Sequence, residues 1–180
     1  MTKAEQAVTM ALSLVNTGVY ELGTGDCDTP VGGPSDCAGF AINKCYNIRR
    51  HHPPFNRGPW ASVIDDLNCN SAIEDADHHQ ELFIPVPRAV PERAAVQPGD
   101  LITYPTFYLP GIKAPFIGHV AIITEVPTNW RSYADLTVVQ CCGPNGHNPG
   151  IIKTNGAHWD DHDKTWPLPQ HRTRLIRVKE

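Results

Sequence analysis

The order of the expected secondary structure constrains the fold of this chain most strongly, because helix-forming segments come first and strand-forming segments follow. The opening segment is predicted to be a helix that ends before Gly18, since Thr2 and Glu5 form a capping box and apolar residues recur on one helical face. A second helix is expected from about Asp36, after a Gly- and Pro-rich stretch at 21–35. Its predicted buried stripe comprises Ala38, Ala41, Ile42 and Cys45.

Strand-forming runs fill the second half of the chain. The runs predicted to be strands are LITY at 101–104, HVAIITEV at 119–126, LTVVQCC at 136–142 and RLIRV at 174–178. Two short helices are predicted before them, one through 60–67 and one that begins with the capping pair Ser71 and Glu74. Helices followed by consecutive strands indicate an α+β domain in which N-terminal helices pack on a small antiparallel sheet, arranged as a meander.

Length and charge limit the function. The 180 residues are expected to form a single domain, 1–180, which we expect to be monomeric. A formal net charge of -4 lacks the positive field that nonspecific binding to nucleic acid or to a membrane surface uses. The start of the chain does not resemble a signal peptide, so we expect synthesis in the cytoplasm, no membrane partner and six reduced cysteines.

Cys37 is the candidate nucleophile, because it stands in SDCAGF where the glycine-rich stretch meets the second helix. A thiol in a first helical turn lies at the positive end of the helix dipole, which favours the thiolate. The small residues Ala38 and Gly39 leave room for a substrate backbone, and the N–H of Cys37 can face the oxyanion of a tetrahedral intermediate. The alternative is that Cys37 is merely packed, as Cys45 on the apolar stripe is expected to be.

His119 is the candidate general base, and it is the first residue of the strand-forming run in FIGHVAII. Strand alternation places His119, Ala121 and Ile123 on one face. An imidazole with a pKa near neutrality can take the thiol proton and return it to the leaving amine. The alternative for any one of the nine histidines is a strand-edge residue that is bonded to backbone.

Four segments, in the order in which they occur, resemble the NlpC family of cell-wall cysteine peptidases, whose members look like a circularly rearranged, minimal papain. DCAGF is similar to the family's nucleophile motif, PGDL to the turn and strand before its histidine, and GHVAII to its histidine strand. VYELGTG at 19–25 is similar to the segment before the family's cysteine. The resemblance spans about residues 4–142 and implies a papain-like fold with Tyr20 and Asp36 lining the site.

The third catalytic residue departs from the family's pattern, in which a polar residue on the next strand, most often histidine, orients the imidazole. Here that strand is TVVQCC, and Gln140 is the residue in register. Its side-chain carbonyl can accept the imidazole N–H and fix the tautomer, although a neutral amide stabilises imidazolium less than a carboxylate does. His147, in the turn-rich CGPNGHN, is the alternative third member.

Several histidines lie outside this pattern. The stretch 46–96 is longer than the family's connection, and we interpret it as an insertion that shapes a groove, contacts a partner or carries solvated loop histidines. His158 and His162 in HWDDHD have the i, i+4 spacing of metal ligands on a helix, but the Glu of the zinc-peptidase motif is missing. The segment is therefore predicted to be a polar loop that binds no metal.

The resemblance implies a cysteine hydrolase that cuts peptide or amide bonds of peptidoglycan, in a stem peptide or cross-bridge, through an acyl-enzyme and without a cofactor. A phage endolysin or an injected antibacterial effector, which reaches the wall after release or delivery, would look like this chain. The alternatives are an acyltransferase or a peptidase that uses the same dyad on a non-wall substrate, a metal-binding protein, and a non-catalytic module that binds the wall.

Overall fold

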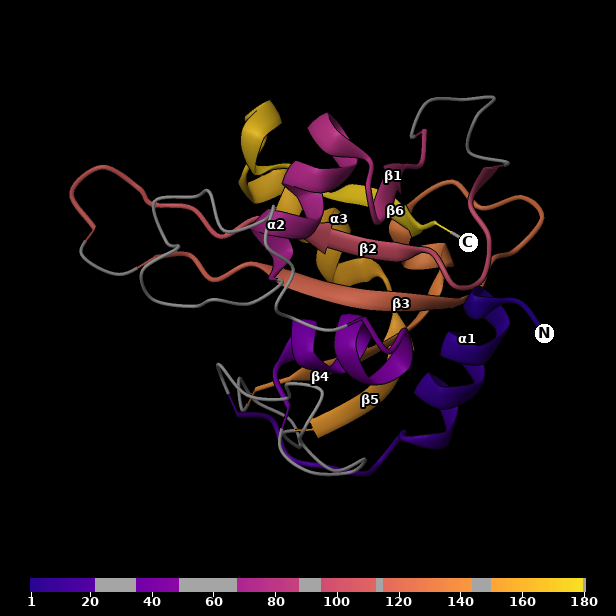
Figure 1. The fold of residues 1–180 in the computed structure, drawn as a ribbon. Helices are drawn as coiled ribbons and strands as arrows, with labels where there is room; N and C mark the ends of the chain where they lie inside the picture. The colour runs from indigo at the N-terminus through magenta and orange to yellow at the C-terminus, as the bar shows by residue number, and fades with distance from the viewer. Residues whose placement is uncertain (22–34, 49–67, 88–94, 113–114, 144–149, 180) are drawn as a thin grey trace.

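A six-stranded antiparallel sheet forms the centre of the fold, with the strand order β1-β6-β2-β3-β4-β5 (Figure 1). The strands are β1 (Phe83–Pro85), β2 (Leu101–Tyr104), β3 (His119–Glu125), β4 (Thr137–Cys142), β5 (Gly150–Asn155) and β6 (Arg174–Val178). Strands β2 to β5 form a meander, and β6 returns to pair with β2 and β1. The computed structural model describes residues 1–21, 35–48, 68–87, 95–112, 115–143 and 150–179.

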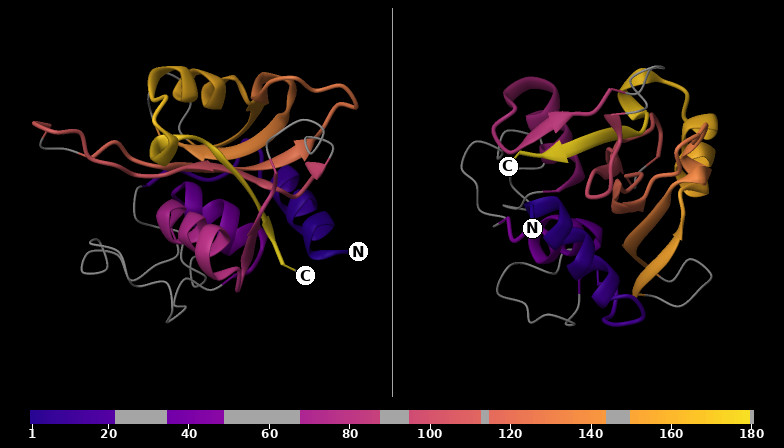
Figure 2. Two further views of the ribbon diagram at one scale, coloured as in Figure 1. Left: turned by 90° about the horizontal axis from the view of Figure 1, so that it is seen from above. Right: turned by 90° about the vertical axis from the view of Figure 1, so that its right-hand side faces the viewer.

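Helices cover both faces of this sheet, as Figure 2 shows. One face carries α1 (Lys3–Ser13), the π-helix η1 (Gly39–Cys45) and α2 (Cys69–Glu74), which continues as the π-helix η3 (Asp75–His79). The other face carries α3 (Ala157–Thr165) and the 3-10 helix η5 (Tyr133–Asp135). A second 3-10 helix, η6 (Pro169–His171), precedes β6.

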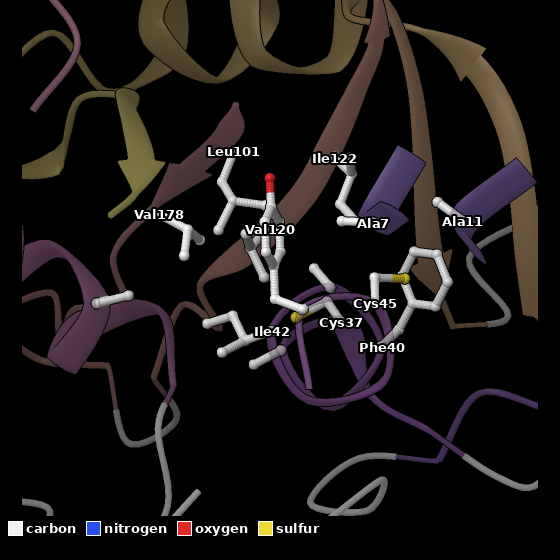
Figure 3. Packing of buried hydrophobic residues seen from close by; sticks show 14 of the residues in the cluster. Ala7, Ala11, Cys37, Phe40, Ile42, Cys45, Leu101, Val120, Ile122 and Val178 are labelled. Atoms are coloured by element: carbon white, nitrogen blue, oxygen red, sulfur yellow. The ribbon is translucent and has the colours of Figure 1, made fainter. Parts of the chain in front are cut away.

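Alternation of side chains along the strands separates two hydrophobic clusters. On β3, Val120 and Ile122 face the N-terminal helices, whereas Ala121 and Ile123 face α3, and all four are fully buried. In the first cluster, side chains of the sheet meet those of α1 and η1, and Cys37 lies among them (Figure 3). Each face of the sheet is therefore the wall of a packed core.

The α+β class and most of the predicted elements are confirmed. Thr2 and Glu5 form the capping box of α1, which ends before Gly18. The stripe predicted for the second helix is buried throughout. Strands β2 and β6 have the predicted bounds, and β3 and β4 differ from the prediction by one residue at one end.

The prediction of a polar loop at HWDDHD is wrong, because this segment belongs to α3. Only Trp159 and His162 of the helix are buried, so its apolar periodicity is weak. The helix is held from outside instead, since the Asp160 carboxylate accepts the backbone N–H groups of Tyr133 and Ala134 in η5. These bonds and the buried Trp159 side chain anchor the helix to the rest of the protein.

The start predicted for the helix near Ser71 is also wrong. The N-cap of α2 is Asn68, whose Oδ1 accepts the N–H groups of Asn70 and Ser71, so the helix begins at Cys69. The stretch 46–96 contains α2 and η3, which pack on the sheet, and β1, which belongs to the sheet. Two strands were not predicted, β1 and β5. The helix predicted at 60–67 lies outside the described residues.

The histidines of the stretch 46–96 fall into two groups. His78 and His79 at the end of η3 are exposed to solvent, and His51 and His52 lie outside the described residues.

In the parts of the chain that the structure describes, no helix combines the length and the hydropathy that crossing a bilayer requires.

Candidate active site

Cys37 lies in the first turn of the helix that continues as η1, where the chain enters the first hydrophobic cluster. Asp36 caps this turn, because its Oδ1 accepts the N–H of Gly39 at 2.6 Å. The Cys37 side chain is only 6% exposed, and its Sγ lies 3.9 Å from the carbonyl oxygen of Gly118. The helix thus delivers the thiol to the end of β3 at which His119 stands.

His119 is held between β2 and β4. It pairs with Tyr104 of β2, and its Nε2 lies 2.6 Å from Oε1 of Gln140 in β4. An amide oxygen can only accept a hydrogen bond, so Nε2 carries a proton and Nδ1 is the ring nitrogen left to exchange a proton with sulfur. The Cys37 thiol lies near enough to the imidazole for each group to shift the pKa of the other. The structure therefore brings Cys37, His119 and Gln140 together.

The glycine before the histidine is required by close backbone packing. A Cβ at Gly118 would lie 2.7 Å from the backbone nitrogen of Thr106 and 2.8 Å from the carbonyl oxygen of Tyr104. The N–H of Gly118 donates to Oγ1 of Thr106 at 2.7 Å, and the backbone of Thr106 exchanges two hydrogen bonds with the Asn70 side chain. This chain of bonds ties α2 to the start of β3.

Cys69 is a residue of the site that the sequence analysis missed. It is the first residue of α2, it is 5% exposed, and it is buried in the same cluster as Cys37. It is also the largest influence on the pKa of the Cys37 thiol, which it lowers. A cysteine at the start of a helix was the signal that singled out Cys37, and Cys69 carries the same signal.

The contacts shift Cys37 and His119 toward an ion pair. The pKa of the Cys37 thiol lies well below its ordinary value, and the largest cause is the interaction with Cys69. Burial raises this pKa, but the interaction with His119 and the charge of His119 lower it further. Burial alone would lower the pKa of His119. Its pKa is nevertheless raised, because burial is outweighed by the interaction with Cys37 and its charge, by the hydrogen bond to Gln140 and by the charge of Asp36. Both shifts favour a thiolate beside an imidazolium.

Aromatic rings enclose the imidazole on the side of α3. The buried ring of Trp159 stacks on His119 with 5.6 Å between centroids and 28° between planes. His158 lies edge-on to His119 at 5.9 Å, and its Nε2 is 2.8 Å from the Tyr104 hydroxyl. Burial, followed by the charges of His119 and His162, lowers the pKa of His158 to about 4, so that its neutral ring accepts the hydroxyl proton.

Of the two remaining predicted site residues, the structure describes Tyr20 and does not describe His147. Tyr20 forms a β-bridge with Ser35, the residue before Asp36, and burial followed by the charges of Cys37 and Asp36 raises its pKa. Its ring packs against Gly143, where an added Cβ would lie 3.0 Å from it. His147 lies outside the described residues.

The histidines of α3 have partners within the protein. Besides the contact of His158 with Tyr104, Nε2 of His162 lies 2.9 Å from the carbonyl oxygen of His171. Among the residues that the structure describes, no group of three or more His, Cys, Asp and Glu side chains could hold a metal ion.

The arrangement has the parts of a cysteine nucleophile: a buried thiol of lowered pKa, an imidazole that exchanges its proton, and an amide oxygen that fixes the tautomer of that imidazole. No metal enters this set. No protein-family model, curated protein or solved structure matches the chain, so the function is inferred from the geometry of this site and from the motifs that form it.

Proposed function

We propose that the protein is a thiol-dependent hydrolase that cleaves peptide or amide bonds of bacterial peptidoglycan. The observation that carries the proposal is the contact of the Cys37 thiol with a His119 imidazole whose Nε2 is bonded to Gln140 at 2.6 Å. A helix that presents a cysteine to the first residue of a strand, with an amide on the next strand, is the papain-like arrangement that the motifs imply. The fold proposed for the chain is accordingly papain-like.

The proposed reaction has two stages. The Cys37 thiolate attacks the carbonyl carbon of the scissile bond, and the oxyanion that forms faces the backbone N–H of Cys37. The His119 imidazolium then protonates the leaving amine from Nδ1, the C–N bond breaks, and a thioester remains. In the second stage His119 takes a proton from water, the hydroxide attacks the thioester, and Cys37 leaves as a thiolate.

Support for the substrate class comes from the motifs. DCAGF, PGDL and GHVAII resemble segments of the NlpC family, whose members cut stem peptides and cross-bridges of the cell wall. The small residue Ala38 and the absence of a side chain at Gly39 place little bulk beside the Cys37 sulfur, which is 6% exposed. A phage endolysin or an antibacterial effector is the kind of bacteriolytic protein that we propose.

The test is a comparison of wild-type protein with Cys37→Ala on purified sacculi, with the soluble fragments identified by mass spectrometry. We expect release by the wild type and release at background level by the variant, because no other group in the dyad can form the thioester. Cys45→Ala is the matched control, since Cys45 is equally buried, lies on the same helix and does not contact His119 in the proposed mechanism. Circular dichroism verifies that each variant folds.

Two results would contradict the proposal. One is fragment release by Cys37→Ala at the wild-type rate, which would remove the cysteine from the mechanism. The other is wild-type protein that leaves sacculi intact. Products that are extended rather than cleaved would instead identify an acyltransferase that uses the same dyad.

A further inference from the structure

Three aromatic rings form a stack where the chain leaves β2 and returns to β3. The segments on either side of this connection extend away from the sheet as an arm (Figure 2). At the base of the arm, Phe107 and Phe116 form a β-bridge with backbone hydrogen bonds of 3.0 and 2.8 Å. The Phe107 ring stacks on the Phe116 ring with 5.4 Å between centroids, and on the His171 ring of η6 with 3.9 Å. These three residues are called the ring stack below.

The outer face of the Phe116 ring is open. His171 and Phe116 cover opposite faces of Phe107, because two rings that stack on the same face would overlap, and Phe107 is only 8% exposed. Trp166 is edge-on to both phenylalanines, 4.7 Å from Phe116 and 5.3 Å from Phe107. A ring on the outer face of Phe116 would be farther from Phe107 than Phe116 is, so Trp166 lies beside the stack. Phe116 remains 43% exposed.

Ring contacts connect the ring stack with the candidate active site. The ring of Tyr104 lies 6.1 Å from that of His119 and stacks on His162 at 3.8 Å. The ring of His162 is in turn edge-on to Phe107 at 6.3 Å. Along the chain Phe116 precedes His119 by three residues, a span of about 10 Å in extended backbone. A ligand on Phe116 would therefore lie next to the catalytic dyad.

We propose that the open face of Phe116 is a sugar-stacking subsite, which holds the glycan strand of peptidoglycan while Cys37 acts on the stem peptide. This inference rests on the proposed hydrolase function, because it assigns a second part of the same substrate to a surface outside the dyad.

The chemistry of the two surfaces matches. The face of an aromatic ring is electron-rich, and one face of a β-linked N-acetylhexosamine presents axial C–H groups of weakly positive character. Stem peptides consist mainly of small and charged residues, so the sugar rings are the broad apolar surfaces of this substrate. An open aromatic face suits those rings better than it suits the peptide.

The subsite is also rigid before a ligand binds. The bridge to Phe107 fixes the backbone of Phe116, and the stacked rings and Trp166 hold its side chain. Because little side-chain freedom remains to be lost, the entropic cost of binding at this ring is small.

The test measures the binding of chitotetraose, a linear oligomer of N-acetylglucosamine that carries no stem peptide, by saturation-transfer-difference NMR. Phe116→Leu keeps apolar bulk but removes the aromatic face, whereas Phe116→Tyr keeps the face. Tyr108→Ala is the matched control, since Tyr108 is an aromatic residue of the same arm with 42% exposure. Circular dichroism verifies that each variant folds.

We expect saturation of the axial sugar protons by wild-type protein, by Phe116→Tyr and by Tyr108→Ala, and its loss in Phe116→Leu. A second readout uses wild-type protein with labelled phenylalanine rings, in which chitotetraose should shift the Phe116 signal, identified as the one missing from Phe116→Tyr. Wild-type protein that transfers no saturation, or a Phe116 signal that stays in place, would overturn the proposal even where Phe116→Leu does not fold. Retained saturation in folded Phe116→Leu, or its loss in Tyr108→Ala, would do the same.

This test is separate from the hydrolase assay. Fragment release from sacculi without binding of chitotetraose would contradict the sugar subsite and leave the hydrolase function standing. Binding without fragment release would support the subsite and contradict the hydrolase function. A Phe116 signal that shifts with free stem peptide and not with chitotetraose would assign the ring to the peptide and overturn the proposal.

Discussion

The contact of Gln140 with His119 allows a quantitative prediction. Gln140→Leu removes the acceptor of the 2.6 Å hydrogen bond to Nε2 while filling a similar volume at a position that is 7% exposed. A buried hydrogen bond to a charged group contributes about 1.5–3 kcal/mol. The bond is stronger with the charged ring than with the neutral one, so its loss lowers the pKa of His119. The corresponding fall in kcat/KM is about ten- to a hundredfold.

The assay is the rate of Cys37 alkylation by iodoacetamide as a function of pH, followed by mass spectrometry of the tryptic peptide that contains Cys37. The rate has a lower step, at which the thiolate–imidazolium pair forms, and an upper step, at which the imidazolium loses its proton. Gln140 stabilises the charged imidazole, so its removal moves the upper step to lower pH.

The conservative variant Gln140→Glu gives the opposite sign. It keeps an oxygen acceptor and adds a negative charge, which stabilises imidazolium more than an amide does, so the upper step moves to higher pH. An upper step that is unchanged in Gln140→Leu would refute the reasoning, because it would mean that the contact is equally strong with either charge state of His119.

Two further predictions concern the second thiol and a buried ion pair. Cys69→Ala removes the largest influence that lowers the pKa of Cys37, so the lower step of the alkylation profile should move to higher pH; an unmoved step would contradict this. Arg177→Met leaves the fully buried Asp100 carboxylate without the guanidinium that lies 2.6 Å away, and should lower the free energy of unfolding by about 3–5 kcal/mol at pH 7 in a urea titration. Burial raises the pKa of Asp100 despite Arg177, so the loss of stability in Arg177→Met should shrink as the pH falls and the carboxyl is protonated. The control is Lys164→Met, in an exposed ion pair, which should lower the free energy of unfolding by about 1 kcal/mol or less. Equal effects of the two variants would contradict the burial argument.

The parts of the fold that could be predicted are those with strong local patterns. The capping box of Thr2 and Glu5 and the alternation around His119 act over a few neighbouring residues, and the corresponding elements lie where expected. Helix α3 could not be predicted in this way because its apolar pattern is weak and its anchors are contacts with residues distant in sequence, such as those of Asp160 with the backbone of η5. Every residue of η1 except Lys44 is buried, so its burial follows no helical period and the sequence pattern does not reveal the widened turns.

In the candidate site, too, residues in local motifs could be predicted, whereas a residue placed by long-range packing could not. Cys37, His119 and Gln140 each stand at a recognisable place in a local motif, and strand register brings the last two together. Cys69 enters the cluster that contains Cys37 through the packing of α2 against β2, and Asn70 is bonded to Thr106 just beyond that strand. These contacts join segments that are distant in the sequence, so no local motif predicts them.

The stacking of Trp159 on His119 has an optical consequence. A cation within about 6 Å of an indole ring interacts with its π electrons, and the centroids here are 5.6 Å apart. The excited state of the indole therefore senses whether the neighbouring ring carries a charge. Intrinsic fluorescence should follow the protonation of His119 without any added dye, and a chain that keeps Trp159 as its emitter would report the charge of the imidazole in real time.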